Sequence, residues 1–143
     1  MEKHELLKVK RPPYTHLKWR FVVPLHDLFA VTSYQSISNF QFPPGFEDLA
    51  ICYNGGYPSP NRFITKEGTT YTMKSLLSFN QHDEESIWQI NTSKALPVAF
   101  AIDDFGNLIC FDRASGGIIV WDISSGYVDH VSYTFDEFLM SLH

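Results

Sequence analysis

Three consecutive apolar runs in the last third of the chain constrain its fold more than any other feature. They read PVAFAI (97–102), LICFD (108–112) and IIVWDI (118–123), and the sequences DDFGN and ASGG separate them. Short apolar runs between clusters of Gly, Asn, Asp and Ser are typical of antiparallel strands joined by tight turns. We therefore predict a three-stranded antiparallel meander, with Gly106 serving the geometry of its first turn.

A helix is predicted to follow the meander. The sequence TFDE (134–137) matches a capping box, in which Thr134 stands at the cap and Glu137 three residues later. The residues after the cap that share one side of the helix are apolar: Phe135, Phe138, Leu139 and Leu142. Because a helix with one apolar side buries that side, we expect it to dock on the sheet.

The stretch ICYNGGYP (51–58) contains paired glycines, which can cradle a phosphate or end a helix. The apolar residues ahead of them have helical spacing: Phe46, Leu49 and Tyr53. Phosphate loops lead from a strand through glycines into the N-terminal end of a helix, whereas these glycines follow the C-terminal end. We therefore assign the backbone geometry of a helix stop to three residues: Asn54, Gly55 and Gly56.

The remaining segments give weaker signals. LKWRFVV (17–23) alternates apolar and charged residues and predicts a strand, and we expect another strand around residues 29–33. Strands are also expected around Phe63 and Tyr71, with a short helix over residues 86–91.

Residues 1–16 are charged and then interrupted by Pro12-Pro13, so we expect a loosely ordered arm there. Residues 17–143 are expected to form a single domain. A twisted, mainly antiparallel sheet with helices packed against it makes the predicted fold class α+β.

The bulk properties exclude several classes of protein. The net charge is −5, and no cluster of Lys and Arg is longer than Lys8 to Arg11. Direct nucleic-acid binding needs clustered cations, so an acidic surface suits a basic protein partner better. No apolar run approaches the roughly 20 residues of a membrane span. The first residues lack the pattern of a secretion signal, and two cysteines are too few for a disulfide framework. We expect a cytoplasmic protein.

No residue pattern points to catalysis, a cofactor or a metal. Asp103 and Asp104 are adjacent carboxylates, but Asp-Asp-Phe-Gly-Asn is also what turn geometry requires. The six histidines are scattered, and two lone cysteines do not supply the ligands of a zinc site. A nucleophilic Cys52 with His130 as base and Asp129 as orienter stays open, because triads assemble in space. A thiol on the apolar side of a helix is inert, however.

Together these features resemble the SUKH superfamily, which includes bacterial toxin-immunity proteins and the fungal Smi/Knr cell-wall regulators. The matching segments are the helix and Asn-Gly-Gly turn (43–58), a central hairpin (96–112), the next strand (118–122) and the closing helix (132–142). The resemblance is strongest over residues 43–142. Residues 1–42 depart from the family, which usually opens with a helix carrying an acidic residue ahead of a Leu-Pro pair.

The resemblance implies a non-enzymatic protein that binds and neutralises a cognate polymorphic toxin by occluding it. The acidic composition suits a basic toxin such as a nuclease domain. Two alternatives stay open: a regulatory scaffold or adaptor of the cell-wall-regulator type, and a small enzyme or small-molecule-binding protein that uses Asp103, Asp104 and Asp112. The oligomeric state is also open, between a monomer and a weak dimer.

Candidate partner contacts are acids near loop ends and large aromatic residues, because acids steer a basic partner and aromatics dominate hot spots. They are Asp83, Glu84, Glu85, Asp103, Asp104, Tyr57, Trp88 and Tyr127.

Overall fold

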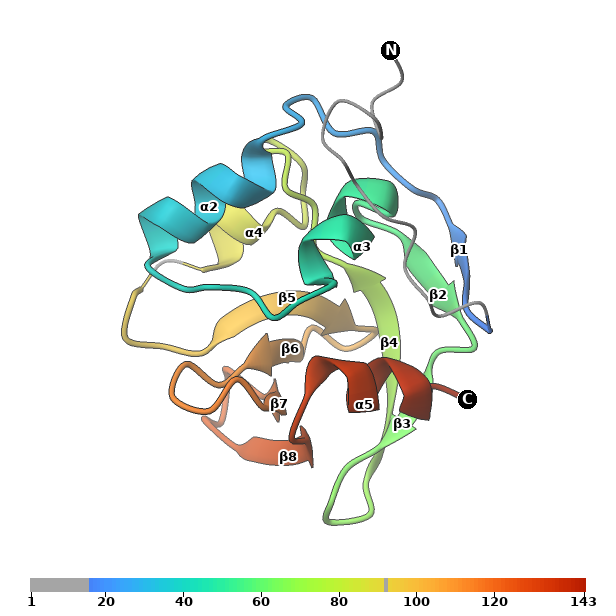
Figure 1. Cartoon of the computed structure of the whole chain (residues 1–143). Helices are drawn as coiled ribbons and strands as arrows, with labels where there is room; N and C mark the ends of the chain where they lie inside the picture. Colours follow the sequence, from blue (N-terminus) through green and yellow to red (C-terminus); the bar gives the residue numbers. More distant parts are fainter. Residues whose placement is uncertain (1–15, 92) are drawn as a thin grey trace.

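A six-stranded antiparallel sheet runs through the computed structural model, which describes residues 16–91 and 93–143 (Figure 1). The strands lie in chain order: β3 (Arg62–Ile64), β4 (Thr70–Leu76), β5 (Val98–Asp103), β6 (Leu108–Phe111), β7 (Ile118–Trp121) and β8 (Val128–Ser132). The predicted meander is confirmed as β5, β6 and β7, and the strands expected around Phe63 and Tyr71 are confirmed as β3 and β4. Of the predicted arm over residues 1–16, all but His16 lies outside the described residues.

Strand β8 was not predicted. Its residues alternate between exposed and buried, as in a strand with one face on the core, but one of the buried residues is Asp129. A carboxylate on the buried face hides the alternation of apolar and polar residues on which strand prediction depends.

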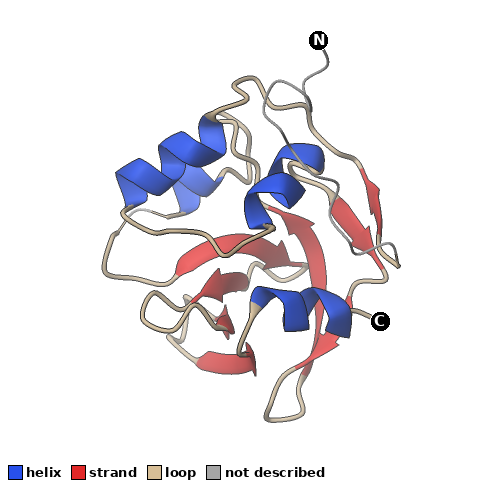
Figure 2. Cartoon of the chain, in the orientation of Figure 1, coloured by secondary structure: helices blue, strands red, loops and turns tan. Residues whose placement is uncertain are grey.

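Helices and a two-stranded sheet complete the described part of the fold (Figure 2). The helices are α2 (Ala30–Ser38), α3 (Phe46–Cys52), α4 (Ile87–Ile90) and α5 (Phe135–Ser141), and the small sheet pairs β1 (Lys18–Arg20) with β2 (Tyr57–Ser59). The strand predicted over residues 17–23 is shorter than expected, because Phe21 has a φ of 56° and ends it. The helices predicted around Phe46, over residues 86–91 and after Thr134 are confirmed, as is the α+β fold class.

The strand expected around residues 29–33 is wrong, since this segment forms α2. Its buried residues are Ala30, Val31, Tyr34 and Ser38, which have the spacing of a helix and not of a strand. The carboxylate of Asp27 accepts a hydrogen bond from the Phe29 amide at 2.9 Å, a local bond that turns the chain into the helix. A helix therefore does precede Pro43-Pro44, but it carries no acidic residue, and Phe42 stands where the resembled family has the Leu of its Leu-Pro pair.

Aromatic rings fasten the helices to the sheet. Phe46 of α3 lies with its ring centroid 5.8 Å from Phe100, 5.3 Å from Phe111 and 5.3 Å from Phe135. These rings come from one helix, two central strands and α5, so a single cluster joins both helices to the sheet. Each such pair contributes about 0.5–1.5 kcal/mol beyond the burial of its surface.

The two edges of the six-stranded sheet approach each other. The Lys66 amide, just after β3, donates to the His130 carbonyl of β8 at 2.8 Å. Arg62 of β3 and His143 exchange two backbone hydrogen bonds, of 3.0 and 2.9 Å. Helix α5 follows β8 and leads from this edge of the sheet toward β3 at the other edge (Figure 1). The hydroxyl of Thr134 caps this helix by accepting from the Glu137 amide at 3.1 Å, as the capping box predicts.

Candidate functional site

Asn54 connects three segments of the chain through its side chain. It is 1% exposed, and its amide nitrogen donates to the Val23 carbonyl and to the Ser78 hydroxyl, both at 3.1 Å. Its side-chain oxygen accepts from the Phe79 amide at 2.8 Å. The assignment of Asn54 to backbone geometry alone is therefore corrected: its side chain satisfies buried polar groups that would otherwise be unpaired.

Asn80 makes a second set of bonds between the same segments. Its side chain accepts from the His26 amide and donates to the Pro24 carbonyl, both at 2.9 Å. It also donates to the Asp83 carboxylate at 3.1 Å, and the Ser78 hydroxyl donates to the same oxygen of Asp83. The loop over residues 78–85 is thus fixed against the segment after β1, and the carboxylate of Asp83 is held in one orientation.

The two glycines of the turn allow β1 and the residues after it to approach the end of α3 closely. Gly55 has a φ of +67°, and a Cβ there would lie 3.4 Å from a methyl group of Val23. At Gly56 a Cβ would lie 2.8 Å from the Tyr53 carbonyl oxygen and 3.2 Å from the ring of Trp19. The Asn-Gly-Gly turn therefore places β1 and the residues after it directly against the end of α3.

These contacts shape a pocket of about 350 Å³, which we call the acidic pocket. Its polar wall is formed by Asp83, Glu84 and Glu85, and its aromatic wall by Phe21 and Tyr57. Four of the predicted contact residues thus come together in one place, although β2 and the loop after β4 supply them from separate parts of the chain.

Phe21 is an unusual residue for the lip of a pocket. It is 74% exposed and has a left-handed backbone, which a bulky residue rarely adopts. Its ring meets that of Tyr57 edge-on, with centroids 5.3 Å apart and an interplanar angle of 82°. Sequence reasoning missed Phe21, because nothing in LKWRFVV signals that the strand stops there. The exposed ring of Phe21 and the half-buried ring of Tyr57 form the kind of surface on which binding hot spots concentrate.

The charge of the acidic pocket is only partly compensated. Lys74 of β4 forms an ion pair with Glu85 at 2.9 Å, and this hydrogen bond raises the pKa of Lys74 above its ordinary value. Of the three carboxylates that line the pocket, Asp83, Glu84 and Glu85, only Glu85 forms an ion pair among the described residues, so the charges of the other two are not paired. Beside the rings of Phe21 and Tyr57, such a site suits the guanidinium or ammonium group of a basic partner.

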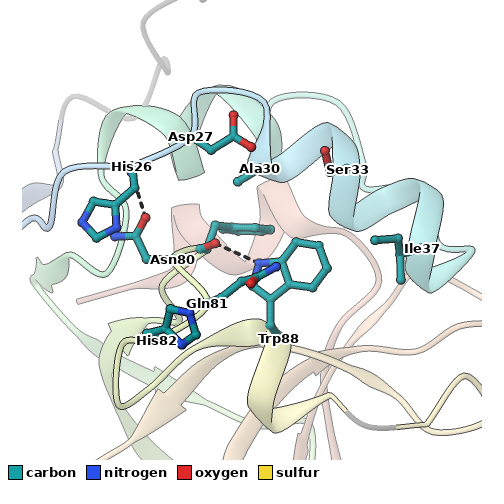
Figure 3. A pocket seen from close by; sticks show the side chains of 10 residues that line it. His26, Asp27, Ala30, Ser33, Ile37, Asn80, Gln81, His82 and Trp88 are labelled. Atoms are coloured by element: carbon teal, nitrogen blue, oxygen red, sulfur yellow. Dashed lines mark hydrogen bonds between the residues drawn. The ribbon is translucent and has the colours of Figure 1, made fainter.

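The loop over residues 78–85 also borders a second hollow, of about 410 Å³ (Figure 3). Trp88 lies in this hollow with Ile37 and His82, and its indole nitrogen donates to the Phe79 carbonyl at 2.8 Å. Trp88 is half-buried, and its ring meets that of Tyr34 at a centroid distance of 5.1 Å. The structure therefore places Trp88 on a different side of the loop from the acidic pocket.

The other predicted contact residues lie elsewhere. Asp103 is 2% exposed, and its carboxylate accepts from the amides of Phe105 and Asn107, both at 2.8 Å. We therefore withdraw Asp103 as a contact residue, because its own turn occupies it. Asp104 is exposed in the same turn, beside a Phe105 that is 90% exposed. Gly106 has a φ of +86° there, as the turn requires.

Tyr127 joins the start of β8 to the β3–β4 hairpin. Its hydroxyl donates to the carboxylate of Glu67, and this hydrogen bond is the main cause that raises the pKa of Tyr127 to about 12. Lys66, in the same hairpin, lies 3.2 Å over the ring of Tyr133. Tyr127 is thus engaged in closing the sheet as well as being exposed.

The geometry argues against the possible triad. Asp129 and His130 are neighbours in β8, so their side chains point to opposite faces of the sheet, and Asp129 is buried while His130 is exposed. Asp129 therefore cannot orient the imidazole of His130. Among residues 16–91 and 93–143, no group of three His, Cys, Asp or Glu side chains is placed to hold a metal ion.

Of three comparisons with known proteins, the one with protein-family models agrees with the resemblance noted in the sequence. No curated protein matches the chain. No solved structure matches it either. None of the described helices has both the length and the apolar character needed to cross a membrane. The model of the SMI1 / KNR4 family (SUKH-1), whose domains are generally non-enzymatic and act in immunity or regulation, matches residues 30–141. The matched region begins with α2 and ends with α5, and it includes the Asn-Gly-Gly turn and the loop of the acidic pocket. The chain belongs to the SMI1 / KNR4 family (SUKH-1).

Proposed function

We propose that this protein is an immunity protein that binds and neutralises a cognate polymorphic toxin in the cytoplasm. The observation that carries the proposal is the acidic pocket, in which the fixed carboxylate of Asp83, the exposed carboxylate of Glu84 and the ring pair of Phe21 and Tyr57 adjoin the Asn-Gly-Gly turn. Membership of the SMI1 / KNR4 family supports a role in binding other proteins.

The proposed mechanism is occlusion without catalysis. A toxin that acts on nucleic acid needs a basic active site, and an acidic inhibitor meets such a site with complementary charge. In this proposal a basic side chain of the toxin enters the acidic pocket and lies against Phe21 and Tyr57. Asp83 and Glu84 accept its hydrogen bonds, and the body of the inhibitor covers the toxin's active site.

The proposed contact residues fall into two groups. Asp83, Glu84, Glu85 and Tyr57 share the acidic pocket and form the primary group. Trp88, Asp104 and Tyr127 lie at three other places and form a secondary group, which a large partner reaches only if it extends beyond the pocket.

The first test is capture of the partner from the native host at low and high salt, with mass spectrometry of what is bound. We expect a stoichiometric partner with a basic toxic domain, less of it at high salt, and growth rescue when the two are co-expressed. Capture of signalling or cell-wall enzymes without any toxin would overturn the immunity role in favour of the adaptor. Capture of no protein would overturn both.

With the partner in hand, charge variants test the site. Glu84→Gln removes one negative charge from the acidic pocket and should lower the association rate by about two- to fivefold. Gln41→Lys changes the net charge equally at an exposed loop position and should have a smaller effect. If Asp104→Asn weakened binding more than Glu84→Gln, the interface would be centred on the β5–β6 turn.

A further inference from the structure

A third hollow, which we call the basic pocket, has a volume of about 200 Å³. It shares two of its lining residues, Ile37 and Trp88, with the hollow of Figure 3. Tyr34 also lines it, and so do two cations, Lys94 and Arg113. The basic pocket therefore combines an apolar and aromatic wall with two positive charges.

Hydrogen bonds hold the guanidinium of Arg113 at this wall. Its Nε donates to the Leu96 carbonyl at 2.6 Å, and its two terminal nitrogens donate to the carbonyls of Ser38 at 3.2 Å and Ser93 at 3.4 Å. Ser38 ends α2, whereas Ser93 and Leu96 precede β5. A guanidinium has five N–H donors, so these bonds leave one N–H unused on each terminal nitrogen.

Within the described residues, Arg113 and Lys94 form no ion pair. Residues 16–143 contain seven Lys and Arg residues against 14 Asp and Glu residues, but the ion pair found among those described joins Lys74 to Glu85. The described residues that line the basic pocket include no Asp or Glu. A cation that is already held in position, with donors to spare, suits an anion from outside the chain, because charge-assisted hydrogen bonds then form without reordering the site.

The wall and the volume of the basic pocket indicate the class of anion. The rings of Tyr34 and Trp88 meet edge-on with centroids 5.1 Å apart, and Ile37 is 59% exposed beside them. An inorganic anion gains nothing from this apolar surface, whereas an aromatic or aliphatic body is stabilised by covering it. Since a cavity of about 150 Å³ accommodates benzene, the basic pocket has room for one ring that carries a carboxylate.

We propose that the basic pocket binds a small organic carboxylate. The carboxylate accepts hydrogen bonds from Arg113 and faces the ammonium group of Lys94, and its apolar body lies against Ile37 and Trp88. Two sources share this chemistry: a free acid, and the last residue of another protein chain. The proposal does not rest on the proposed function, because the acidic pocket attracts the opposite charge and has no lining residue in common with the basic pocket.

The first experiment titrates the full-length, isotope-labelled protein with phenylacetate and follows the indole N–H of Trp88 and the amide of Lys94 by nuclear magnetic resonance. We expect saturable shifts with a dissociation constant of about 1–10 mM. Phenylacetamide lacks the charge and acetate lacks the ring, so each should bind at least about fivefold more weakly. Equal binding of phenylacetamide would overturn the proposal, as would equal binding of inorganic phosphate or the absence of saturable shifts with phenylacetate.

Two peptides distinguish the sources of the carboxylate. Acetyl-Gly-Gly-Phe with a free carboxylate and the same peptide with a C-terminal amide are titrated in the same way. Binding of the free peptide at least as tightly as phenylacetate would support the end of a protein chain as the ligand. Binding of phenylacetate alone would support a free acid. Equal binding of the two peptides would overturn recognition of the carboxylate.

Variants of the full chain locate the site. Lys94→Gln should weaken binding of phenylacetate by about two- to fivefold. Lys18→Gln, which removes the same charge at an exposed position of β1, should leave it unchanged. Arg113→Gln should weaken binding by about tenfold or more, and urea denaturation checks its fold, since this variant also changes the three bonds to carbonyls. Equal affinities of Lys94→Gln and Lys18→Gln would overturn the proposal whatever the behaviour of Arg113→Gln.

Discussion

Asn54 and Val23 form a reciprocal pair: the Val23 amide donates to the Asn54 carbonyl at 2.8 Å, and the Asn54 side chain donates back to the Val23 carbonyl at 3.1 Å. The two residues are 31 positions apart in the sequence. This pair fixes the segment that carries Phe21 to the turn after α3, and the acidic pocket lies between them. The Asn-Gly-Gly turn therefore supports the acidic pocket, the surface that we propose binds the partner.

Replacement of Asn54 by alanine should destabilise the fold strongly. Asn54→Ala removes three hydrogen bonds at a buried site and leaves the Phe79 amide without its partner. We expect a loss of about 3 kcal/mol in the free energy of unfolding, measured by urea denaturation. Gln81→Ala, at an exposed position of the neighbouring loop, should change it by less than about 0.5 kcal/mol. Equal midpoints for the two variants would contradict the structural role of Asn54.

The glycine of the turn can be tested against a second glycine with similar backbone. Gly55 and Gly68 have φ values of +67° and +90°, but only at Gly55 does an added Cβ meet another side chain, that of Val23. Gly68→Val should cost about 1–2 kcal/mol from the left-handed backbone alone. Gly55→Val should cost more, because the added methyl groups also push against Val23. A smaller effect at Gly55 than at Gly68 would show that the turn does not hold β1.

The left-handed backbone of Phe21 predicts an inverted order of stability for two small replacements. At ordinary positions Gly is less stable than Ala by about 0.5–1 kcal/mol. At position 21, Phe21→Ala keeps the left-handed strain and Phe21→Gly removes it, so the Gly variant should be the more stable by about 1 kcal/mol. The same pair at Val22 should show the ordinary order. Both Phe21 variants should bind the partner less well than the parent, since both lack the exposed ring.

Tyr127 should ionise at unusually high pH. Its hydrogen bond to Glu67 favours the neutral phenol and raises its pKa from 10.0 to about 12. Because the folded pKa is the higher one, the stabilisation is fully present below pH 10 and is lost as the pH rises through about 12. Ultraviolet titration of the parent against Tyr127→Phe isolates this phenol. Glu67→Gln should move its titration back toward the ordinary value, and an unchanged midpoint in that variant would show that Glu67 does not raise the pKa of Tyr127.

The parts of the fold that the sequence predicts are those whose signals are local. Apolar runs separated by turn residues predict the meander. Thr134 and Glu137, which lie in one helical turn, predict α5. Helix α2 escaped prediction because Phe29, Val31 and Ser33 also have the spacing of a strand, and only packing against the core decides between the two.

The candidate site could be predicted only in part. Glu84 and Glu85 could be predicted because a run of acidic residues at a loop end is visible in the sequence. The contacts of Asn54 and the position of Phe21 depend on segments that meet only after folding, so no neighbouring residue reveals them. The prediction of Asp103 as a contact residue was wrong, because the sequence does not distinguish an Asp that closes its own turn from one that faces a partner.

The contacts at the edges of the six-stranded sheet have a consequence for solubility. They are the bond from Lys66 to His130 and the pairing of Arg62 with His143. An open sheet presents unpaired backbone groups at both edges, and such edges recruit other chains into aggregates and fibrils. In this protein the Lys66–His130 bond links the two outermost strands, and His143 pairs with Arg62 of β3, so fewer backbone groups at these edges are open to a foreign strand. These edge contacts therefore reduce the tendency to polymerise in a protein whose proposed binding surface also exposes an aromatic ring.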